Sequence, residues 1–335
     1  MTLFTVFGCP VTADALVTAL GGLLAAVLAT VSCQRRGLGA AAGEWFSLLA
    51  IPLCLLGARL GYCLMRYYFV RDDMGWGFFF RFTTGGYVLY GALLGGLLAA
   101  WLASRIVRRP CWDVTDAVAP AAALCIAFCR FAEGLAQQGF GWEVESEALW
   151  RFPWAVYIER QDCWFWSLSQ LEGLVALGLM LALLLCGRGK ARRGGDRTLL
   201  LLLGYASLQL VLESMRCDAV LKWGMVRCSQ LVSAIVVGFV LFVHTRRIKG
   251  HPWQVALCWA GTLACFGLVM AMEFAVENKI EFLYLLFYNA GLDGVQHIPY
   301  CYAAMALGAV GALLIGLKAR SLSYRPASAP LPAEG

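Results

Sequence analysis

The sequence predicts an all-α, polytopic helical membrane protein with about nine transmembrane helices. Three observations support this fold class. The 335 residues are 61% hydrophobic and only 14% charged, which is too apolar for a soluble globular protein. Apolar runs of about 20 residues, the length that crosses a bilayer, recur along the chain. Basic residues gather in alternate connections between these runs, as is typical of the cytoplasmic loops of membrane proteins.

The apolar runs follow one another through most of the chain. Two of them are marginal in length, so a merged or re-entrant element among them stays open. The runs are Val11–Cys33, Trp45–Tyr67, Gly85–Val107, Thr115–Ala136, Phe165–Cys186, Thr198–Met215, Ser229–Thr245, Trp253–Val276 and Tyr300–Leu317.

The charge of the connections predicts the orientation. Arginine and lysine occupy every second connection, at Arg35–Arg36, Arg105–Arg109, Arg188–Arg197, Arg246–Lys249 and Lys318–Arg325. Connections rich in these residues stay in the cytoplasm. We therefore expect the N-terminus outside, the C-terminus in the cytoplasm, and the end of the fourth span toward the outer half of the bilayer.

Composition also excludes several classes of site. The net charge of +6 comes from short loops and not from a basic groove, so a nucleic-acid partner is not expected. The 14 cysteines form no CxxC pair or Cys/His cluster, and the three histidines are scattered. We predict no metal site and no cofactor.

The fourth span carries two charges that are costly in a bilayer. Arg130 and Glu133 lie three residues apart, which places both on one face of a helix. A charged side chain at bilayer depth costs about 2.5–3.5 kcal/mol on insertion scales, so it usually faces a polar cavity or a partner. The pair predicts a functional site, although an ion pair that only joins this helix to a neighbour is the alternative.

Several sequence motifs occur in a specific order between residues 45 and 245. They are LGARLGYCLMRYY (56–68), GGYVLYGALLGG (85–96), DAVAPAAALCIAFCRF (116–131) with QQGFG (137–141), SQLEG (169–173), ESMRCD (213–218) and RCSQ (227–230). In this order they resemble bacterial phosphatidylglycerol–prolipoprotein diacylglyceryl transferases. Small residues in the second motif also let helices approach closely, whatever the function.

The resemblance implies an enzyme of the bacterial plasma (inner) membrane. Such an enzyme moves the diacylglyceryl group of phosphatidylglycerol onto the lipobox cysteine thiol of a secreted preprolipoprotein and releases glycerol phosphate. This chemistry needs guanidinium groups that grip the phosphate. It also needs a group that accepts the thiol proton, because the thiolate is the nucleophile.

The resemblance further implies which residues carry these roles. Arg130 and Gly141 match the arginine and the closing glycine of the family signature, and Arg59 matches the arginine of the second span. Glu213 and Arg216 match the acid and the arginine of the sixth span. As catalytic residues we predict Arg130, Glu133, Tyr90 and Glu213, and as substrate-binding residues Arg130, Arg216, Arg59, Gln138, Gly141 and Gln209.

Four positions depart from the family pattern. Glu133 stands where the family has asparagine, Gln138 where it has glutamate, Gln209 where it has arginine, and Tyr90 at a histidine position where tyrosine also occurs. Glu133 then replaces the lost carboxylate from five residues earlier, and Arg216 stands in for the missing cation. A relative that only binds lipid or a protein partner in the same cavity is the alternative, and a transporter or channel with unrelated chemistry is a third possibility.

The resemblance also divides the chain. Residues 1–248 form the transferase-like membrane domain, and residues 249–318 add two spans. The stretch Glu277–Pro299 between these spans is apolar but interrupted by charge, which is typical of a helix in the membrane interface. Residues 319–335, rich in Pro, Ala and Ser, predict a disordered cytoplasmic tail.

Overall fold

The computed structural model describes residues 2–6, 9–82, 85–185, 193–217, 222–223, 226–248, 251–277, 281–289, 291 and 296–324. Within these ranges, nine helices are long and apolar enough to cross a membrane. They confirm the predicted all-α polytopic class. The chain forms two compact units, residues 1–201 with 216–222, and residues 202–215 with 223–335. The division predicted at residue 248 follows the family resemblance and stays a prediction.

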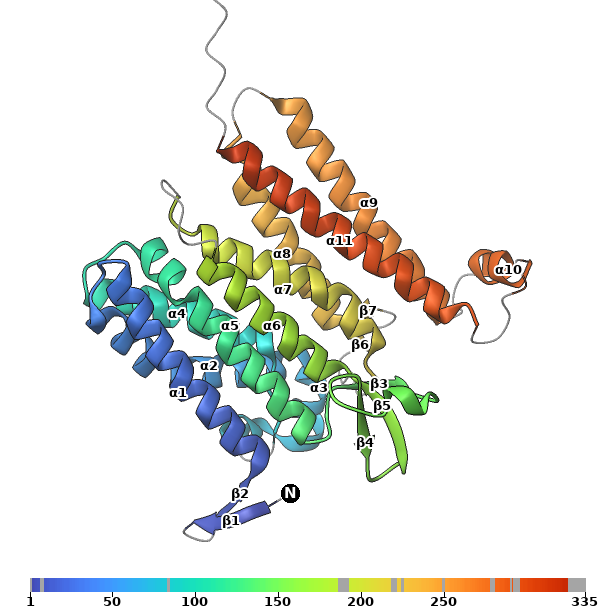
Figure 1. Ribbon diagram of the computed structural model, residues 1–335, viewed down its shortest axis with the longest axis horizontal. Coiled ribbons are helices and arrows are strands. Elements are labelled where there is room, and N and C mark those ends of the chain that lie inside the picture. Colours follow the sequence, from blue (N-terminus) through green and yellow to red (C-terminus); the bar gives the residue numbers. More distant parts are fainter. Residues whose placement is uncertain are drawn as a thin grey trace, which may run out of the picture. The chain divides into compact units, whose positions relative to one another are not determined.

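Unit 1 begins with a short hairpin and continues as a helical bundle (Figure 1). Its long helices pack in the pairs α1 with α5, α2 with α4 and α5 with α6. The elements are β1 (Thr2–Val6), β2 (Cys9–Thr12), α1 (Ala13–Arg35), α2 (Ala40–Met65), α3 (Tyr67–Phe69), the π-helix η1 (Val70–Met74), the 3-10 helix η2 (Trp76–Phe80), α4 (Leu89–Ile106), α5 (Cys111–Leu135), β3 (Phe140–Glu143), the 3-10 helix η4 (Glu147–Leu149), β4 (Ala155–Ile158), β5 (Cys163–Ser167), α6 (Leu168–Leu185) and the start of α7 (Asp196–Met215).

Two of these helices approach each other through glycines. A Cβ atom at Gly91 or Gly95 of α4 would collide with backbone carbonyl groups of α2, at Gly57 and Leu53. The packing function expected for the glycines of the third span is therefore confirmed at these two positions. The same span begins later than predicted, because Gly85 and Gly86 have positive φ angles of 72° and 84° and the helix starts only at Leu89.

A small antiparallel sheet, absent from the sequence prediction, lies between α5 and α6. Its strand order is β3-β5-β4. Phe165, expected at the start of the fifth span, belongs to β5 instead, and α6 begins at Leu168. The strand contains three consecutive aromatic residues, Trp164 to Trp166, and aromatic residues favour strands, so the apolar run overestimated the length of the helix.

Asp116 fastens the start of α7 to α5. Its carboxylate accepts hydrogen bonds from the backbone N–H groups of Gly195 (3.1 Å), Arg197 (2.9 Å) and Thr198 (3.0 Å). Gly195 directly precedes α7, and Arg197 and Thr198 belong to its first turn, whose N–H groups have no partner within the helix. Asp116 therefore acts as an N-terminal cap supplied by another helix.

Unit 2 contains the rest of α7, the short strands β6 (Lys222–Trp223) and β7 (Val226–Arg227), and the helices α8 (Cys228–Thr245), α9 (Pro252–Val276), α10 (Glu281–Asn289) and α11 (Ile298–Ser323). Helices α9 and α11 run side by side (Figure 1). The helix α10 falls within the stretch predicted for the interface. Helix α11 reaches Ser323, so residues 319–323 of the predicted tail are helical, and residues 325–335 lie outside the described residues.

Candidate active site

The C-terminal end of α5 carries Arg130 and Glu133 on one helical face, as their spacing predicts. Nη1 of Arg130 lies 2.5 Å from Oε2 of Glu133. Helix α6 contributes Glu172 from its second turn. Its carboxylate lies 2.7 Å from Nε of Arg130. Arg216 directly follows the last residue of α7.

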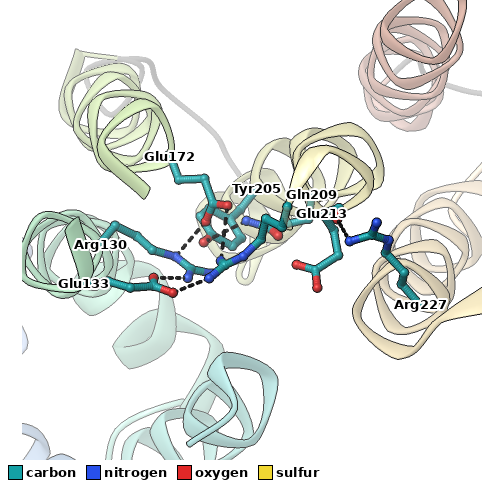
Figure 2. Close-up of polar contacts among 8 residues, drawn as sticks. Arg130, Glu133, Glu172, Tyr205, Gln209, Glu213 and Arg227 are labelled. Carbon is teal, nitrogen blue, oxygen red and sulfur yellow. Dashed lines mark hydrogen bonds and ion pairs between the residues drawn. The ribbon is translucent and has the colours of Figure 1, made fainter. Parts of the chain in front are cut away.

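These four residues close into a ring of alternating charge, which we call the charge quartet. Arg216 binds Oε1 of Glu133 through Nη2, and its Nη1 lies 3.7 Å from Oε1 of Glu172. Each guanidinium therefore faces both carboxylates, and the formal charges cancel. Figure 2 shows Arg130 with Glu133 and Glu172 converging from two helices.

Burial distinguishes the two acids of the quartet. The Glu172 side chain is fully buried, whereas that of Glu133 keeps 21% of its surface exposed. The arginines are 13% and 10% exposed. An ionic group this deeply buried is costly unless it is paired, and the ring supplies those pairs. Glu133 is the member that solvent or a ligand reaches most easily.

A backbone turn around Gly139 holds the quartet together. A Cβ atom at Gly139 would lie 3.2 Å from Nη2 of Arg216, 3.2 Å from Cδ of Glu133 and 2.7 Å from Cβ of Ser169. With a φ of +70°, this position needs glycine for its conformation as well as for space. Its carbonyl accepts a hydrogen bond of 2.9 Å from the N–H of Ser169, at the start of α6.

Phe140, the residue after Gly139, fixes the segment that carries Arg216. The carbonyl of Phe140 accepts a hydrogen bond of 3.0 Å from the N–H of Cys217. Residues 139 and 140 thus bond to the segments that contribute Glu172 and Arg216. The hydroxyl of Ser169, a fully buried residue, has no hydrogen-bond partner among the described residues.

The sequence prediction named three of the quartet's four members. Arg130, Glu133 and Arg216 lie in contact with one another, and their catalytic and binding roles stay predictions. Glu172 was not among the predicted site residues. Its signal was the SQLEG motif, which begins α6.

Arg59 has different surroundings. It is fully buried on α2, and its guanidinium donates to the backbone carbonyls of Phe78 (2.6 Å), Arg81 (2.7 Å), Gly86 (3.2 Å) and also Gly85. Its Cζ atom lies 4.0 Å from the centre of the Phe78 ring. These contacts favour a role in holding the connection between α2 and α4. Substrate binding by Arg59 stays a prediction.

The other predicted residues of unit 1 lie on separate elements. Tyr90 is buried near the start of α4, with 9% of its surface exposed. Gln138 lies after the end of α5 and is exposed, and its N–H donates to the carbonyl of Glu133 at 3.0 Å. Gly141 is buried on β3.

Two predicted residues belong to the part of α7 in unit 2. Gln209 is 1% exposed, and its amide donates to the hydroxyl of Tyr205 at 3.0 Å. The backbone carbonyl of Glu213 accepts a 2.6 Å hydrogen bond from Arg227, which is also 3.4 Å from Glu273 of α9. The roles of Gln209 and Glu213 in a site stay predictions.

Among the described residues, no group of three or more His, Cys, Asp or Glu side chains has the geometry to hold a metal ion. The quartet itself offers two guanidinium groups and two carboxylates. Guanidinium groups bind phosphate through paired hydrogen bonds, and a carboxylate accepts a proton. The arrangement therefore suits the transfer of a group attached to a phosphate.

Comparison with known proteins gives a consistent result. A family model described as prolipoprotein diacylglyceryl transferase matches residues 1–246. A phosphatidylglycerol–prolipoprotein diacylglyceryl transferase of Streptococcus pneumoniae (strain Hungary19A-6) is 29% identical over 219 residues, 63% of this chain and 80% of the relative. An enzyme of the same name from Listeria monocytogenes serotype 4b (strain CLIP80459) is 28% identical over 211 residues, 61% of this chain and 74% of the relative.

Proposed function

The chain belongs to the prolipoprotein diacylglyceryl transferase family, and from that premise we propose that it transfers diacylglyceryl from phosphatidylglycerol to a lipobox cysteine, with the charge quartet as its active site. The cysteine sulfur forms a thioether bond to the glycerol carbon of the diacylglyceryl group. The bond from that carbon to the phosphate oxygen breaks, and glycerol phosphate leaves. The thiol proton passes through a carboxylate to the departing phosphate. The membrane is the plasma membrane of a bacterium.

One observation carries this proposal. Arg130 and Arg216 hold the two oxygens of the Glu133 carboxylate between their guanidinium groups. Two oxygens of a phosphodiester have comparable spacing and bind guanidinium in the same paired manner. The Glu133 carboxylate therefore occupies the position in which the two arginines would grip the phosphate of phosphatidylglycerol and stabilise the charge of the leaving group.

The difference in burial assigns separate roles to the two acids. Glu172 is fully buried and faces both arginines, so it keeps them in place whether or not a ligand is bound. Glu133 is partly exposed, so the incoming phosphate displaces it from the guanidinium groups. Once displaced, its carboxylate is free to take the proton of the cysteine thiol.

The positions that depart from the family pattern fit this assignment. Gln138, where the family has glutamate, is exposed beyond α5 and cannot serve as a base. Glu133 supplies a carboxylate on the helix itself. The buried Ser169 hydroxyl is a further donor, because Ser169 adjoins Gly139 beside the quartet.

Complementation tests the proposal. A bacterial strain depleted of its own diacylglyceryl transferase should grow when it expresses this chain, and should fail to grow with Arg130→Ala or Glu133→Gln at equal membrane abundance. Arg160→Ala is the matched control, because Arg160 is exposed between β4 and β5. Mass spectrometry of a lipobox peptide should detect the diacylglyceryl thioether only with active variants.

Two results would contradict the proposal. Growth that does not depend on Arg130 would remove the quartet from catalysis. Absence of growth and of thioether product, with the protein present in the membrane and phosphatidylglycerol bound, would indicate a relative that only binds the lipid.

A further inference from the structure

The end of unit 1 where α4 meets α5 contains a basic cavity of about 510 Å³, which we call the arginine pocket. Its lining residues are Trp101, Ser104, Arg105, Arg108, Arg109, Pro110 and Cys111. None of these is acidic, and Asp113, the nearest acid along α5, does not line the cavity. The volume lies in the range of cavities that hold small ligands.

The arginine pocket is separate from the charge quartet. It begins at Cys111, the first residue of α5, whereas Arg130 lies 19 residues further along that helix. At the usual rise this separation is about 29 Å, close to the thickness of the hydrocarbon core of a bilayer. The quartet neutralises its arginines with two carboxylates, whereas the described residues that line the pocket include three arginines and no carboxylate. An anion is therefore its natural ligand.

The backbone of the pocket is a helix-ending turn with an unusual residue in it. The N–H of Arg109 donates to the carbonyl of Ser104 (2.9 Å), and that of Arg108 to the carbonyl of Arg105 (3.3 Å). This is the Schellman pattern, in which glycine usually occupies the left-handed position. Here Arg108 occupies it, with a φ of +53°. An arginine costs backbone strain there that glycine would avoid, which favours a role for its side chain.

An apolar stripe leads to the pocket along α4. Leu94, Leu98 and Trp101 follow at helical spacing on one face and are 68%, 45% and 43% exposed. The guanidinium of Arg105 lies 5.5 Å from the centre of the Trp101 ring, so the stripe ends at the cations. A ligand with a phosphate head and an acyl chain matches this sequence of surfaces, whereas a free phosphate would use only the head.

We propose that the arginine pocket binds the phosphate headgroup of an anionic glycerophospholipid whose acyl chain lies along α4. This is a second lipid site, at the opposite end of α5 from the charge quartet. Arg108 and Arg109 bind the phosphate, and Arg105, stacked near Trp101, marks the boundary between headgroup and acyl chain.

The test uses the full-length chain, purified in detergent and titrated with dioleoyl phosphatidylglycerol or dioleoyl phosphatidylcholine in native mass spectrometry. The variant Arg108→Gly with Arg109→Gln removes two charges, and glycine suits the backbone at position 108. We expect it to lose one bound phosphatidylglycerol, with about a hundredfold weaker affinity, because each of the two lost charge-assisted hydrogen bonds contributes roughly tenfold. Its melting temperature should not fall. A lipid held at the quartet is unaffected, so failure of the proposed catalysis is a separate result.

The matched control is Arg35→Gln with Arg36→Gln, which removes two exposed charges from the connection between α1 and α2. It should retain all bound phosphatidylglycerol, and phosphatidylcholine should not occupy the pocket. Equal losses in the control and the pocket variant, or no loss in the pocket variant, would overturn the site. Displacement of the lipid by millimolar inorganic phosphate or glycerol phosphate would overturn its assignment to a lipid.

Discussion

Unit 1 buries arginine in two different ways. Arg59 points its guanidinium at backbone carbonyl groups of one connection, between residues 78 and 86. Arg130 and Arg216 point theirs at the carboxylates of Glu133 and Glu172. A carbonyl in a folded connection cannot leave its cation without unfolding that connection, whereas a carboxylate on a side chain can rotate away. The first kind of contact stabilises the fold, and the second can be exchanged for a substrate phosphate.

The largest effect is expected from the exchangeable arginines. Arg216→Ala should lower the rate of diacylglyceryl transfer by about 10²- to 10³-fold, since it removes a preorganised donor from the leaving phosphate. Glu133 keeps Arg130 as its partner, so the protein should remain in the membrane. The measurement is thioether formation on a lipobox peptide at saturating phosphatidylglycerol.

Arg216→Lys refines this test. Lysine keeps the charge but cannot bind two oxygens as a planar fork. We expect it to restore less than a tenth of the activity. Full activity with lysine would mean that charge alone matters at this position. The paired hydrogen bonds of the Arg216 guanidinium would then not be needed for transfer.

Arg59 should give the opposite result. Arg59→Met keeps the apolar part of the side chain but leaves several buried carbonyls without donors, so the free energy of unfolding should fall by about 3 kcal/mol or more. The protein that remains folded should transfer diacylglyceryl at nearly the normal rate. Folded yield and rate per folded molecule are measured separately, by size-exclusion chromatography and by the thioether assay. A normal yield with a lost rate would move Arg59 into the substrate site, as the family resemblance predicts.

Arg59 also illustrates what sequence reasoning could reach. Hydropathy is a local property, so the long helices were predictable within a few residues. The partners of Arg59 lie 19 to 27 residues away in an irregular connection, where no periodic pattern marks them. The strand β3 was missed for the same reason, because its partner β5 is distant in the sequence, with Phe140 opposite Ser167. The strands β4 and β5 form a local hairpin, but the apolar run that begins at Phe165 was assigned to the fifth span.

The candidate site divides in a similar manner. Arg130 and Glu133 were predictable as a pair because one helix sets their spacing. Their meeting with Glu172 and Arg216 depends on the turn at Gly139 and Phe140, which only the folded chain displays. The family resemblance pointed to Gly141 as the closing glycine, whereas the glycine that adjoins the quartet is Gly139.

Gly139→Ala tests whether the backbone turn beside the charge quartet is needed for transfer. A methyl group there would lie 2.7 Å from Cβ of Ser169 and needs a left-handed conformation, which together should cost about 1–2 kcal/mol. The start of α6 must shift, and Glu172 moves with it. We expect the transfer rate to fall tenfold at most, with a small fall in thermal stability. The loss of rate therefore lies between those expected for the Arg216 and Arg59 substitutions. Gly178→Ala is the control, because nothing lies within 4 Å of a Cβ atom there.

The smallest combined change in stability and transfer rate is expected from Ser169→Ala. The buried hydroxyl has no partner among the described residues, so its removal should not lower stability and could raise it slightly. If the hydroxyl donates to the substrate phosphate, the transfer rate should fall by about fivefold, the loss of one hydrogen bond of roughly 1 kcal/mol. Ser167→Ala is a close control, because Ser167 is equally buried and its hydroxyl also lacks a partner among those residues, yet it lies on β5 before the helix. Equal rates for the two variants would mean that only the arginines recognise the phosphate. A slower rate for the Ser169 variant alone would mean that the Ser169 hydroxyl of α6 also donates to the phosphate.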